Sequence, residues 1–258
     1  MEELSWVQRA TKSGDDVVGF NLDIPTASAW ILHAMYERVE GDLGLSHDEV
    51  HKIELAAGTT ERAIVAGVDL DDKTWVPGGS LGWTTDPGSG WRRLRWAELA
   101  ARLGEPMSRP GKGPFYGCFP SVRIDGRSWP ASIQPPGEGS LDAQSWRRLV
   151  QILQSFTGGD TDSFAFYGLL TTPKWDEPHL YRGPSSSLGR LEQLGYKSSP
   201  SNLWSAYQDW FVYTDYDLWG TQIWGSDELL EAVVSDSIIE AYPAAEIMIP
   251  RSTGATNE

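Results

Sequence analysis

Apolar residues recur at helical spacing between Leu141 and Phe156, and this segment, with the strands that follow it, limits how the chain can fold. The apolar stripe consists of Trp146, Leu149, Val150, Leu153 and Phe156, with Gly158-Gly159 directly behind it. A stripe at this spacing forms one face of a helix, and glycine is the residue that most often ends a helix. The sequence therefore predicts a long amphipathic helix from Leu141 to Phe156.

The segments after this helix have the patterns of strands joined by turns. Phe164 to Leu170 is a short apolar run typical of a buried strand. Asp209 to Asp215 and Thr221 to Trp224 flank a turn and predict a hairpin. Helices and strands are intermixed without the strict alternation of a doubly wound parallel sheet. We therefore predict an α+β protein with a mixed, largely antiparallel sheet and flanking helices, arranged as one domain or two small lobes.

Capping residues mark two further helices. Ser46 with Glu49 three residues later is a capping-box pattern, which predicts a helix from Ser46 to Ala57. Ser226 precedes two acidic residues that favour the first turn of a helix, and this helix should run to about Val234.

A helix is also expected after Pro25, running to about Arg38, because five apolar residues in this segment recur at helical spacing. The other expected elements are helices over 96–103 and 185–194 and strands over 17–20, 63–70, 73–76, 129–133 and 245–249.

Proline and glycine concentrate between Gly104 and Ser140, where a boundary between two lobes would fall. The predicted organisation is an N-terminal lobe over 1–104, a connection with a short edge strand over 105–140, an acidic C-terminal lobe over 141–249 and a disordered tail over 250–258. A single domain over 1–249 is the alternative, because a chain of 258 residues also fits one large core.

Charge is the first indication of function. The chain has 36 acidic and 21 basic residues and a formal net charge of −15, and the segment from Asp160 onward contains 15 acids against 5 bases. Such a charge repels duplex nucleic acid and anionic lipid and attracts cationic proteins. The aromatic and basic run from Trp91 to Trp96 resembles single-strand binding segments in composition, but it is too short to reverse this balance. The expected partner is a basic protein, and neither nucleic acid nor membrane is expected.

The expected location is the cytoplasm. No run reaches the roughly 18 to 20 apolar residues that span a bilayer, and no signal peptide is recognised at the start of the sequence. The single cysteine, Cys118, has no partner for an internal disulfide, which suits a reducing compartment. We expect Cys118 to be a small buried hydrophobic residue rather than a nucleophile paired with a histidine.

Thirteen tryptophans are an unusual number, and four of them lie within a stretch of 21 residues. Alternation along strands cannot bury all four on a single face, and exposed tryptophans are frequent anchors of protein interfaces. The predicted partner-binding residues are these tryptophans and the acids beside them: Trp204, Trp210, Trp219, Trp224, Asp209, Asp215 and Asp217.

Two alternatives assign chemistry to the chain. Asp215 and Asp217 would point to the same side of an extended strand and could act as the carboxylates of a hydrolase or transferase, with or without a divalent metal. His47 and His51 lie four residues apart on a predicted helix, so that with Glu54 they could bind zinc. The order of residues differs from the zincin motif, because Asp48 rather than glutamate follows His47.

The C-terminal run from Asp209 to Asp217, followed by Gly220-Thr221-Gln222, resembles a recurring arrangement in a family of uncharacterised actinobacterial (high-GC Gram-positive) proteins. The segment from Pro135 to Asp142 is similar to the same group. Some of these proteins look like immunity proteins of polymorphic toxin systems, which are acidic cytoplasmic α+β proteins. The charge asymmetry and the clustered tryptophans predict a non-enzymatic, acidic protein-binding module without a cofactor, and the resemblance adds the hypothesis that it is an immunity protein that neutralises a basic toxin. The resemblance supplies no catalytic residue.

Overall fold

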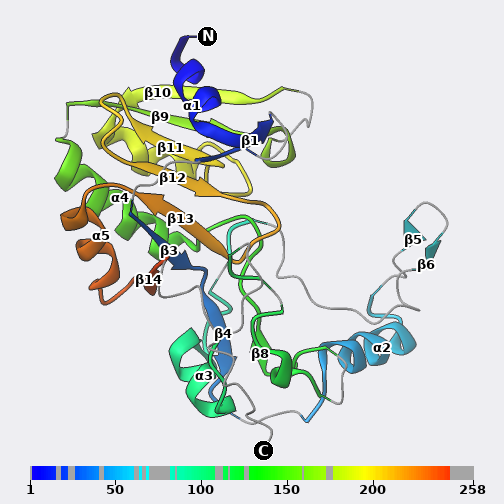
Figure 1. The fold of residues 1–258 in the computed structure, drawn as a ribbon. Helices are drawn as coiled ribbons and strands as arrows, with labels where there is room; N and C mark the ends of the chain where they lie inside the picture. Colours follow the sequence, from blue (N-terminus) through cyan, green and yellow to red (C-terminus); the bar gives the residue numbers. More distant parts are fainter. Residues whose placement is uncertain are drawn as a thin grey trace, which may run out of the picture.

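The protein has an α+β fold in which a large antiparallel sheet is covered by helices and a smaller sheet lies beyond one end (Figure 1). This computed structural model describes residues 2–244 apart from twelve gaps. These gaps are 16–18, 23–26, 41–43, 61–63, 66–67, 70–81, 85, 108–112, 116, 125–127, 159 and 173–176, and side chains are also left out at 2, 11–15, 64–65, 68–69 and 170. The predicted fold class is confirmed.

The large sheet has seven strands in the order β10-β9-β11-β12-β13-β3-β14, and every neighbouring pair is antiparallel. In that order the strands are His179–Pro184, Asp162–Tyr167, Asn202–Ser205, Phe211–Thr214, Gly220–Trp224, Ser28–Leu32 and Ala241–Pro243. Strand β3 comes from the beginning of the chain but lies between two strands from its end. A strand of the predicted N-terminal lobe therefore pairs with strands of the predicted C-terminal lobe. The boundaries of the lobes remain a prediction.

Both faces of the large sheet are buried. On one face lie the helices α4 (Ala143–Thr157) and α5 (Asp227–Val234) and the 3-10 helix η6 (Ser185–Gln193). On the other face lie η1 (Glu2–Leu4), α1 (Ser5–Ala10) and the hairpin of β1 (Thr11–Asp15) and β2 (Gly19–Leu22). Because side chains alternate along a strand, each strand contributes to two apolar layers.

The smaller sheet places β4 (Met35–Arg38) between β7 (Trp91–Leu94) and β8 (Ile133–Gln134). Its core is formed with α3 (Trp96–Leu103) and receives Trp219 from the β12–β13 connection. Strand β4 follows β3 after only two residues, so one stretch of chain takes part in both sheets. The remaining elements are α2 (His47–Ala57), β5 (Ile64–Val65), β6 (Val68–Asp69), η3 (Pro120–Val122) and η5 (Leu169–Thr171).

The capped helices agree with prediction. Ser46 is the N-cap of α2, with both hydrogen bonds of the capping box to Glu49, and Gly58 adopts the left-handed conformation that ends it. Helix α5 begins after Ser226 as expected, and α3 has its predicted bounds. The β12–β13 hairpin is also confirmed. In the long helix α4, however, Phe156 is 42% exposed rather than part of the buried stripe.

The expected helix between Pro25 and Arg38 is wrong, because Ser28–Leu32 and Met35–Arg38 are strands. Ala29, Trp30 and Ile31 are all buried, as both faces of a central strand are. A continuous apolar run of this kind also satisfies helical spacing, so periodicity alone does not separate the two.

Two smaller expectations also differ, and three fall outside the described residues. The expected strand over 63–70 contains two short strands that pair with each other, β5 and β6. The helix over 185–194 is a 3-10 helix. The strands over 73–76 and 245–249 and the tail over 250–258 lie outside the described residues. Among the residues that are described, none belongs to a helix both long and apolar enough to cross a bilayer.

Candidate partner-binding site

The four tryptophans predicted to contact a partner are core residues. Trp204, Trp210, Trp219 and Trp224 are 1%, 2%, 0% and 4% exposed. The expectation that they cannot all be buried assumed one apolar face, but the large sheet is covered on both sides and Trp219 enters the core of the smaller sheet. None of the four presents a surface to a partner, and their assignment as exposed anchors is corrected.

Asp215 organises the turn between β12 and β13. One of its carboxylate oxygens accepts a hydrogen bond from the Tyr213 hydroxyl at 2.7 Å, and the other accepts from the backbone N–H of Asp217 at 3.0 Å. A carboxylate used in this way stabilises a turn by mimicking a backbone contact. Both Asp215 oxygens therefore take part in the turn, and the use of Asp215 and Asp217 as a catalytic pair stays a prediction.

Glu138, in the loop before α4, is a carboxyl group near this turn that the sequence analysis did not single out. The backbone N–H of Gly139 donates to the carbonyl of Leu218 at 3.0 Å, which holds the loop against the turn. A Cβ at Gly139 would lie 2.7 Å from the Cα of Tyr216, so only glycine permits this approach. Burial raises the pKa of Glu138, and the negative charge of Asp217 adds to the shift.

The proposed zinc ligands of α2 do not converge. A ring nitrogen of His47 hydrogen-bonds the carbonyl oxygen of Ile133 at 2.7 Å, and Glu54 is exposed. Within the described part of the chain, no three histidine, cysteine or carboxylate side chains are placed to hold a metal ion. Cys118, by contrast, is fully buried in the smaller core, as expected.

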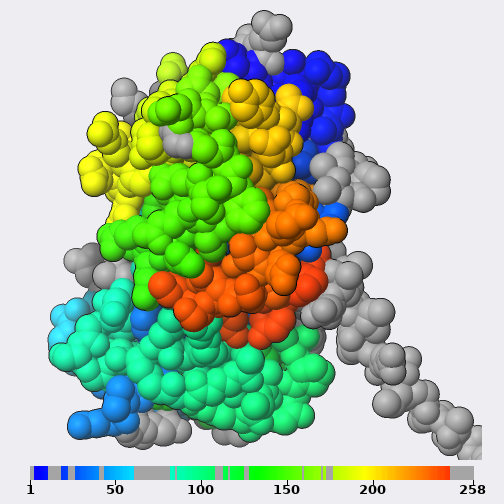
Figure 2. Space-filling model, turned by 90° about the vertical axis from the view of Figure 1, so that its left-hand side faces the viewer, coloured from blue at the N-terminus to red at the C-terminus, as the bar shows by residue number. Residues whose placement is uncertain are grey.

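Three chain segments meet at one end of the large sheet. The Trp210 indole N–H donates to the hydroxyl of Thr157 at the end of α4, 2.6 Å away. The Ala206 N–H donates to the carbonyl of Asp162 at 2.8 Å. A Cβ on Gly225, just before α5, would lie 3.5 Å from the Cβ of Trp210. Figure 2 shows the β11–β12 turn in gold, α4 in green and α5 in orange side by side on this face.

Exposed carboxylates are concentrated where these segments meet. Asp160, Asp209, Asp227 and Glu228 are exposed, and none of them forms an ion pair with another described residue. The nearby Arg182 is already occupied, because its Nε lies 2.7 Å from the carboxylate of Asp162. Four charges of one sign without an ion-pair partner among the described residues create a negative field that favours a cationic partner.

Tyr207 is exposed on the turn between β11 and β12, two residues before Asp209. It is 74% exposed, the largest value among the exposed large hydrophobic side chains of the described residues. The turn is rigidly built: Gln208 donates to the carbonyl of Ser205, and the N–H of Asp209 donates to the Ser205 hydroxyl, both at 2.9 Å. Gln208 accordingly adopts the left-handed conformation, with φ of 61°. A tyrosine held in this way loses little conformational entropy on binding.

We call Tyr207 with Asp160, Asp209, Asp227 and Glu228 the acidic end surface. Of the predicted site residues it retains only Asp209. Tyr207 is an aromatic residue in a polar turn between two strands, a pattern that indicates exposure. The prediction instead selected the neighbouring tryptophans. No protein-family model, curated protein or solved structure matches the chain.

Proposed function

We propose that the protein is a non-enzymatic binding module that holds a basic protein partner on the acidic end surface. The observation that carries this proposal is the exposed Tyr207 at an end of the sheet where four carboxylates are exposed and form no ion pair with a described residue. Charges at the edge of an interface accelerate encounter, while a central aromatic residue supplies much of the binding energy. The acidic end surface has both exposed carboxylates and an exposed aromatic side chain.

A basic toxin is the partner that the resemblance to immunity proteins suggests, and its charge would suit this surface. Binding without catalysis also fits the engagement of both Asp215 oxygens in a turn. A cytoplasmic location is part of the same proposal, since the one cysteine, Cys118, is a buried free thiol.

The first experiment is capture of partners from lysate of the source organism with tagged protein, followed by binding measurements on the isolated partner. We expect a stoichiometric basic protein whose association rate falls as salt is raised. Tyr207→Ala should weaken the complex at least 10-fold, about 1.4 kcal/mol, because it removes the central aromatic contact.

Charge reversal provides the matched comparison. Asp209→Lys and Glu54→Lys change the net charge equally, but Glu54 lies on α2, away from the acidic end surface (Figure 1). Asp209→Lys should slow association and Glu54→Lys should leave it nearly unchanged. Equal effects of the two variants, or the absence of any basic partner at low salt, would rule out the proposal.

A further inference from the structure

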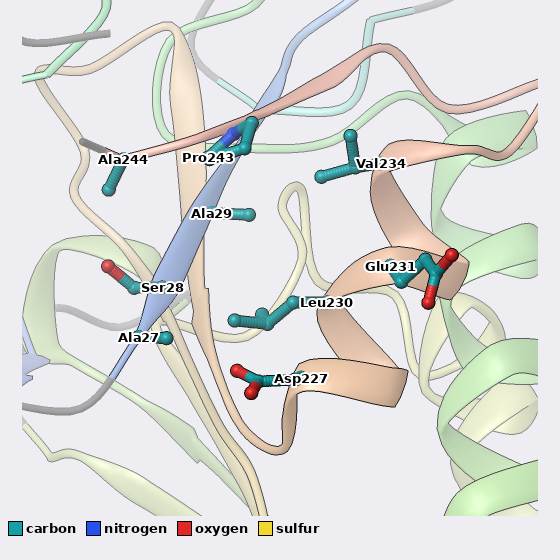
Figure 3. A pocket seen from close by; sticks show the side chains of 9 residues that line it. All are labelled: Ala27, Ser28, Ala29, Asp227, Leu230, Glu231, Val234, Pro243 and Ala244. Carbon is teal, nitrogen blue, oxygen red and sulfur yellow. The ribbon is translucent and has the colours of Figure 1, made fainter. Parts of the chain in front are cut away.

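An apolar groove adjoins the acidic end surface, between α5 and the edge of the large sheet (Figure 3). It has a volume of about 500 Å³, within the range of pockets that hold small ligands. The residues around it are Ala27, Ser28, Ala29, Asp227, Leu230, Glu231, Val234, Pro243 and Ala244. Asp227 belongs to both features, so the groove continues the acidic end surface.

The groove exists because the strands on its floor carry small side chains. Ala27, Ser28 and Ala29 leave space beneath the helix, and β14 ends at Pro243. From the opposite side, Leu230 and Val234 of α5 point toward β3 (Figure 3). The interior of the groove is therefore apolar and suited to a hydrophobic side chain.

The rim of the groove is negatively charged. Asp227 and Glu231 are four residues apart on α5, and both line the groove. The Asp227 carboxylate points toward β3, whereas the Glu231 carboxylate lies at the outer side of the helix (Figure 3). Both are exposed, and neither forms an ion pair with a described residue. Like charges at this spacing destabilise a helix by a few tenths of a kcal/mol, and a bound cation would reverse the effect.

We propose that the groove receives an apolar side chain from a basic segment of the partner, with flanking lysines or arginines pairing with Asp227 and Glu231. The inference rests on the proposed function and adds a sequence preference to it: an apolar residue between cations. A second copy of this chain is disfavoured as the occupant, because its net charge of −15 would oppose the same acidic rim.

Two labelled peptides of equal charge test the preference, Lys-Lys-Leu-Leu-Lys-Lys and Lys-Lys-Ser-Ser-Lys-Lys, titrated by fluorescence anisotropy at low salt. We expect the leucine peptide to bind the protein at least 10-fold more tightly. Ala27→Trp places a large side chain at the mouth of the groove, from an exposed position that leaves the core intact. It should abolish the preference, and the Ala244→Trp variant gives a second, independent test.

Glu231→Lys should weaken both peptides, whereas Glu54→Lys, with the same change in net charge, should weaken neither appreciably. Equal affinities of the two peptides for the unaltered protein, or a preference that survives both tryptophan variants, would overturn the groove inference. The proposed function would still hold if binding of the basic partner weakened with added salt and depended on Tyr207 and Asp209. Self-association abolished by Ala27→Trp in sedimentation experiments would identify a second copy as the occupant and also overturn the inference.

Discussion

The carboxylate of Glu240 caps helix α3 at Trp96: one oxygen accepts the Trp96 N–H and the other the Ala97 N–H, each at 2.9 Å. Glu240 lies 144 residues away from Trp96 in the sequence and is only 8% exposed. A carboxylate at the N-terminus of a helix satisfies free backbone donors and interacts favourably with the helix dipole. This pair therefore fastens the end of the chain to the smaller sheet.

Removal of the Glu240 carboxylate should destabilise the protein. Glu240→Ala leaves a buried N–H at Trp96 without a partner and should lower the free energy of unfolding by about 2 kcal/mol. Glu240→Gln keeps an acceptor and should cost less. Urea denaturation measures both, with the exposed Glu231→Ala as control. Equal stability of Glu240→Ala and the control would contradict the capping role.

His33 should make stability depend on pH. Its ring hydrogen-bonds the carbonyl of Gly137 at 2.7 Å and the hydroxyl of Thr221 at 3.0 Å, and burial lowers its pKa from 6.5 to about 4. Between these values the unfolded chain binds a proton that the folded protein does not. The contribution is therefore complete above pH 6.5 and is lost as the pH falls toward 4, by roughly 3 kcal/mol.

The measurement is urea denaturation at pH 7 and at pH 4.5 for the unaltered protein and for His33→Gln. The variant should be less stable at pH 7 but should lose less stability on acidification. A parallel loss in both proteins would mean that other groups cause the pH dependence.

Asp215 and Asp217 should respond differently to substitution. Asp215→Ala removes two hydrogen bonds of the β12–β13 turn and should lower stability by about 1 kcal/mol. Asp217 is exposed, and Asp217→Ala should change stability by less than about 0.5 kcal/mol. Thermal unfolding of the two variants distinguishes this structural role from a shared catalytic one, which would leave stability unaffected by either.

Trp204 and Tyr207 should also respond differently to substitution, because Trp204 lies in the core and Tyr207 on the surface. Trp204 stacks on Phe164 with ring centroids 5.3 Å apart, and Trp204→Ala should cost about 3 to 5 kcal/mol. Tyr207→Ala should change the free energy of unfolding by less than about 0.5 kcal/mol while weakening partner binding. Comparable destabilisation by the two variants would show that Tyr207 contributes to packing rather than to recognition.

Local signals predicted the elements whose ends are set by their own residues. The capping box of Ser46 and Glu49 marks where α2 begins within the local sequence, although residues 128–133 also contact this first turn, and Gly104 marks the end of α3. The identity of β3 depends instead on its neighbours: Ile31 pairs with Thr221 on one side and Ala241 on the other. The local sequence does not reveal pairing with such distant strands. Its apolar spacing therefore predicted a helix in place of β3.

The acidic end surface shares its charge with the segment singled out in the sequence but only one residue, Asp209, with the predicted site. The excess of acids after Asp160 is visible in the sequence and agrees with the acidic end surface. The choice of aromatic residue failed because exposure depends on which faces of a sheet are covered. Trp224 and Tyr207 are both aromatic residues beside a turn, yet only the three-dimensional structure distinguishes the buried one from the exposed one.

The position of β3 also sets the order of events during synthesis. His33, directly after β3, and Thr221, in one of its neighbouring strands, are separated by 188 residues. At about 5 to 20 residues per second, a ribosome needs roughly 10 to 40 seconds to make the intervening chain. Throughout that time Ala29, Trp30 and Ile31 have no strand to pair with, although all three are buried in the finished sheet. The nascent chain must therefore emerge beyond β13 before β3 can pair with it, and until then these apolar residues depend on other contacts to stay out of water.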